Sequence, residues 1–117
     1  MRTVAKESEI LKTITDGLSA MKIWHMRCNT GGMFGVHKGK RWAVKFGRKG
    51  MADILAIMRF APNPVNVHMP IWFEVKRTGQ HQTPEQIAFQ GEVEHEGHRY
   101  YVVHSWEEAL EVLNGHS

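Results

Sequence analysis

The most constraining feature of the chain is a short apolar run that carries two charges at its end, Ile71-Trp72-Phe73-Glu74-Val75-Lys76. Aromatic and β-branched residues in such a run predict a strand, and strand side chains alternate between faces. Glu74 and Lys76 therefore project from one side, whereas Phe73 and Val75 project from the other, where they can pack. A carboxylate and an amine on a half-buried strand are costly unless something uses them. We therefore expect a functional site on this strand.

A second apolar run supplies another carboxylate. The turn residues Gly50-Met51-Ala52 lead into Asp53, which heads the expected strand 54–60. Asp53 and Glu74 provide two oxygen ligands for a hard divalent cation, and Lys76 adds a fixed positive charge. This combination predicts a metal-dependent phosphodiesterase that uses Mg²⁺ or Mn²⁺. In the alternative interpretation, Glu74 and Lys76 form a same-face ion pair, which contributes little if it is exposed.

The first 20 residues predict a helix over about residues 3–20. Its apolar positions recur at steps of three and four residues, which marks one buried face: Ile10, Leu11, Ile14, Leu18 and Met21. Glu7 extends this face, whereas Glu9 lies about 200° around the helix from Glu7 at 100° per residue. Glu7 is therefore the acid that can reach an interior metal site. Alternatively, Glu7 is a solvated first-turn glutamate that interacts with the helix dipole.

Basic residues concentrate in the middle of the chain. Residues 31–41 are rich in glycine and positive charge, which is typical of a flexible loop that follows a phosphate backbone. Alternatively, this segment is a solvated hairpin loop. Arg27 and Asn29, which precede it, could contact DNA phosphate or merely end a strand. The candidate nucleic-acid contacts are Arg27, Asn29, Lys38, Lys40, Arg41, Arg48 and Lys49.

The remaining expected elements complete an α/β pattern. Thr83-Pro84-Glu85-Gln86 predicts a capping box that opens a helix ending near Glu96, with Gly97 as its left-handed cap. Ser105 should cap a last helix in the same way. The expected strands are 22–28, 42–46, 54–60, 71–77 and 99–104, and a connector with three prolines spans 61–70. Counted without the short strand 42–46, the order is helix, three strands, helix, strand, helix, which predicts a mixed central sheet flanked by helices.

Composition sets limits on the class of protein. The 117 residues suit one domain spanning 1–117, and the net charge of +3 is compatible with a nucleic-acid partner. Cys28 is the single cysteine, so we expect a reducing, cytoplasmic location and no cysteine zinc cluster. No apolar run approaches the roughly 18 residues that span a membrane. The eight histidines are scattered, and we expect neither a zinc site nor an organic cofactor.

The ordered motifs resemble a known nuclease family. Gly50…Asp53 followed by Glu74-x-Lys76 resembles the D…ExK arrangement of PD-(D/E)xK nucleases, and the wider pattern is similar to the virus-type replication-repair nuclease (VRR-NUC) domain. An ExK by itself arises often by chance, whereas the ordered set is more specific and covers nearly the whole chain. The set comprises Glu7, Arg27-Cys28-Asn29-Thr30-Gly31, Gly50-Met51-Ala52-Asp53, Glu74-Val75-Lys76, Thr83-Pro84-Glu85-Gln86, Gly97 and Tyr101-Val102-Val103.

The resemblance implies a restriction-endonuclease-like core and a set of site roles. The Val75 backbone carbonyl would be a third metal ligand beside Asp53 and Glu74, with Glu7 binding directly or through water. Lys76 would orient or help to deprotonate the attacking water, or stabilise the transition-state charge. The position matching Gln86 belongs to the site in the family. In this chain Gln86 can steady Lys76 or a phosphate, or serve only as a helix cap.

The implied activity is a Mg²⁺- or Mn²⁺-dependent endodeoxyribonuclease that acts on branched or flapped intermediates such as Holliday junctions. A small stand-alone domain of this family implies a homodimer, because two active sites can address two strands. Two alternatives remain open at this level. One is a non-catalytic nucleic-acid-binding module that retains the fold, and the other is an RNA-directed nuclease.

Overall fold

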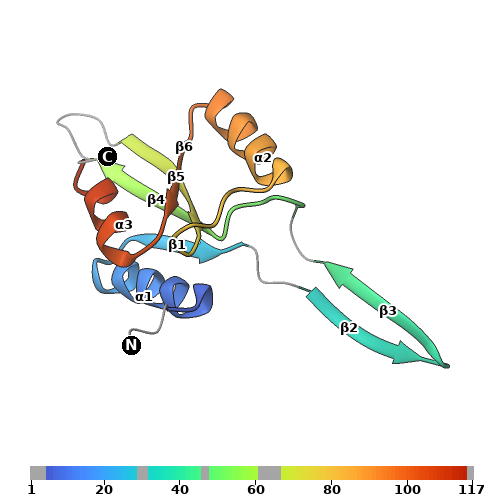
Figure 1. Ribbon diagram of the computed structural model, residues 1–117. Helices are drawn as coiled ribbons and strands as arrows, with labels where there is room; N and C mark the ends of the chain where they lie inside the picture. The colour runs from blue at the N-terminus through green and yellow to red at the C-terminus, as the bar shows by residue number, and fades with distance from the viewer. Residues whose placement is uncertain (1–4, 29–31, 46–47, 61–66, 116–117) are drawn as a thin grey trace.

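The computed structural model describes residues 5–28, 32–45, 48–60 and 67–115. Within these ranges the chain forms three helices and six strands, and the strands form two sheets (Figure 1). The elements in chain order are α1 (Glu7–Ala20), β1 (Trp24–Arg27), β2 (Gly32–His37), β3 (Lys40–Lys45), β4 (Ile54–Phe60), β5 (Val67–Val75), α2 (Pro84–His95), β6 (Arg99–Val103) and α3 (Trp106–Leu113). No helix in the described ranges is long and apolar enough to span a bilayer.

The four-stranded sheet has the order β1-β4-β5-β6. Neighbours β1, β4 and β5 pair antiparallel, whereas β6 pairs parallel to β5 after the α2 crossover. The expected mixed sheet is therefore confirmed, and so is the α/β class. Alternation along β5 places Phe73 and Val75 in a core with α1 and α3, while Trp72 packs with Phe89 of α2 on the opposite face. Helices thus cover both faces of the sheet, as predicted (Figure 1).

The segment expected to be a basic loop forms most of a hairpin instead. Strands β2 and β3 pair antiparallel along six residues each, from Gly32 opposite Lys45 to His37 opposite Lys40. The connecting residues Lys38 and Gly39 both have positive φ, at 51° and 76°. Two such residues make the tight turn whose twist matches paired strands, so the glycines in this segment do not prevent pairing. Strand β3 corresponds to the expected strand 42–46, whereas β2 was not expected, so five strands precede α2 and the expected order with three was wrong.

The connector before β5 is shorter than predicted. Strand β5 begins at Val67, so Pro70 lies within the strand, opposite Ile57 of β4. Proline is tolerated there because β6 pairs with β5 only from Ile71 onward, which leaves the other side of Pro70 without a ladder bond to make. Residues 61–66 lie outside the described chain.

The predicted helix signals are confirmed at α2 and α3. The Thr83 hydroxyl accepts from the Gln86 N–H, and the Gln86 side chain accepts from the Thr83 N–H. Gly97 follows α2 with φ of 87°, and the Ser105 hydroxyl accepts from the Glu108 N–H at the start of α3. Local sequence therefore decides where these two helices begin.

Candidate active site at the ends of β4 and β5

Asp53 and Glu74 lie directly across from each other. The β4–β5 register pairs Ile54 with Phe73, so the preceding residue Asp53 falls opposite Glu74. The Asp53 Oδ2 accepts from the Val75 N–H at 2.8 Å, and the Asp53 carbonyl accepts from the Cys28 N–H at 2.8 Å. The Asp53 carboxylate therefore takes the place of a backbone acceptor at the end of the ladder. These bonds fix the carboxylate next to that of Glu74.

Glu74 is the buried acid of the described chain, with 2% of its surface exposed. Its Oε1 is shielded from solvent and has no hydrogen-bond partner among the described residues. Burial, then a hydrogen bond to the Asp53 carboxyl and the negative charges of Asp53 and Glu7, raise the pKa of Glu74 to about 9, against the opposing charge of Lys76. In the metal-free protein, Glu74 therefore keeps its proton at neutral pH.

Lys76 and Glu7 approach the carboxylate pair from two elements. Lys76 follows β5, and its N–H continues the sheet by donating to the Val103 carbonyl at 3.0 Å. Its ammonium favours the charged form of Glu74, yet within the described ranges no carboxylate lies within 4 Å of it to form an ion pair. Glu7 is the first residue of α1 and is exposed. The orientation of Glu7 toward the site stays a prediction.

The donor set fits a hard divalent cation, although it is not a complete cage. The described residues contain no group of three or more His, Cys, Asp or Glu side chains placed to hold a metal. They do contain two adjacent carboxylates, one with a buried oxygen that lacks a partner. Carboxylate oxygens suit Mg²⁺ or Mn²⁺, and a buried oxygen without a hydrogen bond is stabilised by a cation. Glu7 and the Val75 carbonyl stay predicted ligands.

Gln86 is placed by the helix that it caps. Its side-chain oxygen is occupied by the Thr83 N–H at 2.9 Å, so the capping interpretation is confirmed and the catalytic role stays a prediction. The turn before Asp53 packs against the same helix end. A Cβ on Gly50, which has φ of 81°, would lie 2.2 Å from the Glu85 carbonyl oxygen. The first turn of α2 and the turn that delivers Asp53 are therefore in contact.

The predicted nucleic-acid contacts separate into two groups. Arg48 pairs with Glu92 and lies 5.6 Å from the centre of the Phe89 ring, and Lys49 approaches Glu85 at 3.4 Å. These two residues bind α2. Lys38, Lys40 and Arg41 are exposed at the far end of the hairpin, and Arg27 is exposed at the end of β1. Asn29 lies outside the described residues.

Sequence reasoning missed Tyr100, whose hydroxyl is affected by the charges of Glu74 and Asp53, and Gln82, which donates a hydrogen bond to that hydroxyl. Burial, together with the negative charges of Glu74 and Asp53, raises the pKa of the Tyr100 hydroxyl to about 12, against a hydrogen bond from Gln82. The Gln82 amide donates to the Tyr100 hydroxyl at 3.2 Å and to Gln90 at 3.0 Å. Tyr100 reaches this place because β6 pairs it with Trp72, two residues before Glu74. Nothing in the local sequence signals that pairing.

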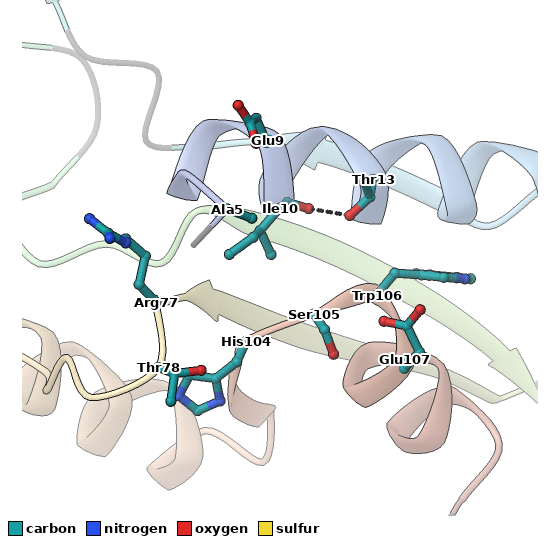
Figure 2. A pocket seen from close by; sticks show the side chains of 10 residues that line it. All are labelled: Ala5, Glu9, Ile10, Thr13, Arg77, Thr78, His104, Ser105, Trp106 and Glu107. Atoms are coloured by element: carbon teal, nitrogen blue, oxygen red, sulfur yellow. Dashed lines mark hydrogen bonds between the residues drawn. The ribbon is translucent and has the colours of Figure 1, made fainter. Parts of the chain in front are cut away.

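A separate cavity of about 500 Å³ opens between α1 and α3. Figure 2 shows Arg77 at one end and Trp106 at the other, with Ile10 and Thr13 on α1 and Ser105 just before α3. The buried Nε of Arg77 has no partner among the described residues. Glu9 also lines this cavity. None of the predicted site residues lines it.

Comparison with protein-family models, with curated proteins and with solved structures found no match to this chain.

Proposed function

We propose that the protein is a metal-dependent endonuclease that hydrolyses phosphodiester bonds in DNA. The observation that carries this proposal is the buried Glu74 carboxyl, which has an unpartnered oxygen and lies against Asp53. Because Glu74 is buried beside the Asp53 carboxylate, the metal-free protein must either bear the repulsion of two ionised acids or keep a proton on Glu74, and each costs stability above the pKa of a free carboxyl. A divalent cation offsets that repulsion, and the Lys76 ammonium nearby supplies a fixed charge for a phosphate.

The chain's own residues divide the chemical work. Asp53 and Glu74 would hold Mg²⁺ or Mn²⁺, with Glu7 and the Val75 carbonyl completing the ligands. The metal, when bound, would lower the pKa of a water and neutralise charge on the phosphoryl group. Lys76 would orient the attacking water or stabilise the charge that develops on the phosphate oxygens. The hydrogen bond from the Val75 N–H to Asp53 keeps one carboxylate aimed at the site throughout.

The finer parts of the proposal follow the VRR-NUC resemblance. They comprise a restriction-endonuclease-like core, branched or flapped substrates such as Holliday junctions, a homodimer and a cytoplasmic location. The positive net charge supports a nucleic-acid partner. A non-catalytic binding module is disfavoured, because buried converging carboxylates would repel a phosphate backbone and serve no purpose in binding alone.

The decisive experiment is cleavage of labelled linear, flapped and four-way-junction DNA, and of matched RNA, with Mg²⁺, Mn²⁺ or EDTA. We expect DNA cleavage that requires metal and is lost in Asp53→Asn and Glu74→Gln. The matched control is Glu111→Gln, an exposed acid on α3 that should cut like the parent. Cleavage of RNA alone would establish the RNA-directed alternative. No cleavage by the parent with either metal would overturn the proposal in favour of a binding module.

A further inference from the structure

The β2–β3 hairpin projects from the body as a two-stranded ribbon (Figure 1). Within the described chain, no other element packs extensively against either of its strands. The molecule is accordingly elongated, with extents of 61 × 41 × 28 Å. A two-stranded hairpin that lacks a covering layer is marginally stable in water. Such a ribbon is therefore stabilised when a partner covers it.

The charge of this region identifies the partner's chemistry. No aspartate or glutamate occurs between Asp16 and Asp53, whereas the hairpin alone carries four lysines and arginines: Lys38, Lys40, Arg41 and Lys45. At the tip, the side chains of His37, Lys38, Lys40 and Arg41 are all exposed. Positive charge that is this concentrated and has no acidic residue in the same stretch complements a polyanion.

The chain segments that lead to and from the hairpin join the four-stranded sheet at the candidate metal site. The chain leaves the sheet after Cys28 and returns at Asp53, and these two residues are joined by an N–H···O bond of 2.8 Å. The ion pairs of Arg48 and Lys49 with α2 hold the returning segment against the body. Two strands of six residues extend roughly 20 Å at 3.3–3.4 Å per residue. The two strands therefore place the basic tip roughly 20 Å from the strand ends Gly32 and Lys45.

We propose that the β2–β3 ribbon enters the major groove of a double-stranded DNA segment that flanks the bond to be cut. The major groove of B-form DNA is wide enough to admit a two-stranded ribbon. The ribbon's length of roughly 20 Å equals the axial rise of about six base pairs, so the flanking duplex must be at least about that long to accommodate it. A single strand offers no groove, and the major groove of duplex RNA is too deep and narrow for side chains. This inference rests on the proposed function and names its substrate class.

The test variant combines Lys38→Asn, Lys40→Gln and Arg41→Gln. Asparagine tolerates the positive φ of position 38 and creates the Asn-Gly pair that this turn type favours, so the hairpin is retained. A second variant deletes residues 36, 37, 40 and 41, which removes two opposite pairs of residues and preserves the register and faces of the rest. The first variant removes charge at full ribbon length, whereas the second shortens the ribbon and also removes Lys40 and Arg41, so only a loss larger than that of the first variant reports on reach.

The matched control removes the same charge from the body through Lys6→Gln, Lys12→Gln and Arg99→Gln, all of which are exposed. Lys12 pairs with Asp16 on the surface of α1, where such a pair contributes little stability. If net charge alone governs binding, this control and the tip variant will behave alike.

Binding is measured in EDTA, over a salt series, to a labelled 24-base-pair DNA duplex, to one of its strands and to an RNA duplex of the same sequence. We expect the tip variant to lose about tenfold or more in affinity for duplex DNA and to lower the log–log salt slope by about 0.9 for each lost phosphate contact. Affinity for single-stranded DNA and for the RNA duplex should change far less. Equal losses on all three nucleic acids, or a tip variant that binds duplex DNA like the control, would overturn the proposal.

Failure of this inference and failure of the proposed function give different results, because the binding assay requires neither metal nor cleavage. If the parent never cuts but binds duplex DNA through the tip, the nuclease proposal is wrong and the ribbon proposal holds. If the parent cuts but the tip and deletion variants bind duplex DNA like the parent, the ribbon proposal alone is wrong.

Discussion

Replacing Glu74 with glutamine should stabilise the metal-free protein, even though it destroys the proposed metal site. Glutamine has the shape of the protonated acid, and its amide can donate to Asp53. The pKa of Glu74 rises from 4.5 in the unfolded chain to about 9 in the folded protein. The folded parent therefore holds a proton that the unfolded chain has released, and glutamine removes this penalty.

The magnitude follows from linkage between protonation and folding. A folded-state pKa that is raised gives stability that is complete below the unfolded value and is lost as pH rises toward the folded value. At 1.36 kcal/mol per pH unit above 4.5, the penalty for the parent reaches about 3 kcal/mol at pH 7. The Glu74→Gln variant should gain about that free energy of unfolding, or a rise in Tm of about 10 °C.

The assay is urea unfolding of both proteins in EDTA at several pH values between 4.5 and about 9, which are the pKa values of Glu74 in the unfolded and folded states. The stability difference should be near zero at the acidic end and should grow steadily with pH. Mn²⁺ should then stabilise the parent far more than the variant, because it binds only a folded, ionised site. The exposed Glu111→Gln serves as control and should show no pH-dependent difference. A variant that is less stable than the parent at pH 7, or a difference that does not change with pH, would refute the reasoning.

Three further predictions concern groups around the carboxylates. Lys76→Ala should keep metal and DNA binding but lose cleavage by about 10²-fold or more. Lys76→Arg should not restore cleavage, since a guanidinium does not deprotonate and places its charge differently. If Lys76→Ala and the parent cleave at equal single-turnover rates, the lysine has only a structural role. Glu7→Gln should slow cleavage by about tenfold or more and weaken Mn²⁺ binding measured by calorimetry, as expected for a ligand or nearby charge. Glu9→Gln should do neither. The reverse pattern would mean that the predicted faces of the first helix are assigned to the wrong residues. Gly50→Ala should lower the free energy of unfolding, measured in urea, by roughly 2–4 kcal/mol, because the new Cβ would lie 2.2 Å from the Glu85 carbonyl oxygen. Gly79→Ala, also at positive φ but with nothing within 4 Å, should cost only about 1 kcal/mol, and equal losses would show that the contact is unimportant.

Local sequence determined the elements whose signals lie within a few residues of one another. The capping box at Thr83, the glycine cap at Gly97 and the alternation along β5 each depend on neighbours in the chain, and each appears as predicted. The limits of β4 are likewise those expected, Ile54–Phe60. The segment 31–41 was misjudged, because its glycines were taken to indicate a loop. Two residues of positive φ were sufficient to pair it as a hairpin.

Only the tertiary structure decided how these elements combine into a site. Asp53 meets Glu74 because the register of β4 against β5 places them opposite each other, and Tyr100 joins them through the parallel pairing of β6. The pKa of Glu74 depends on burial, which no short stretch of sequence specifies. Arg48 and Lys49 read as free cations in the sequence but pair with α2. The physical reason is that register, burial and ion pairing arise from contacts between residues distant in the chain, whereas caps and alternation arise from the geometry of adjacent backbone.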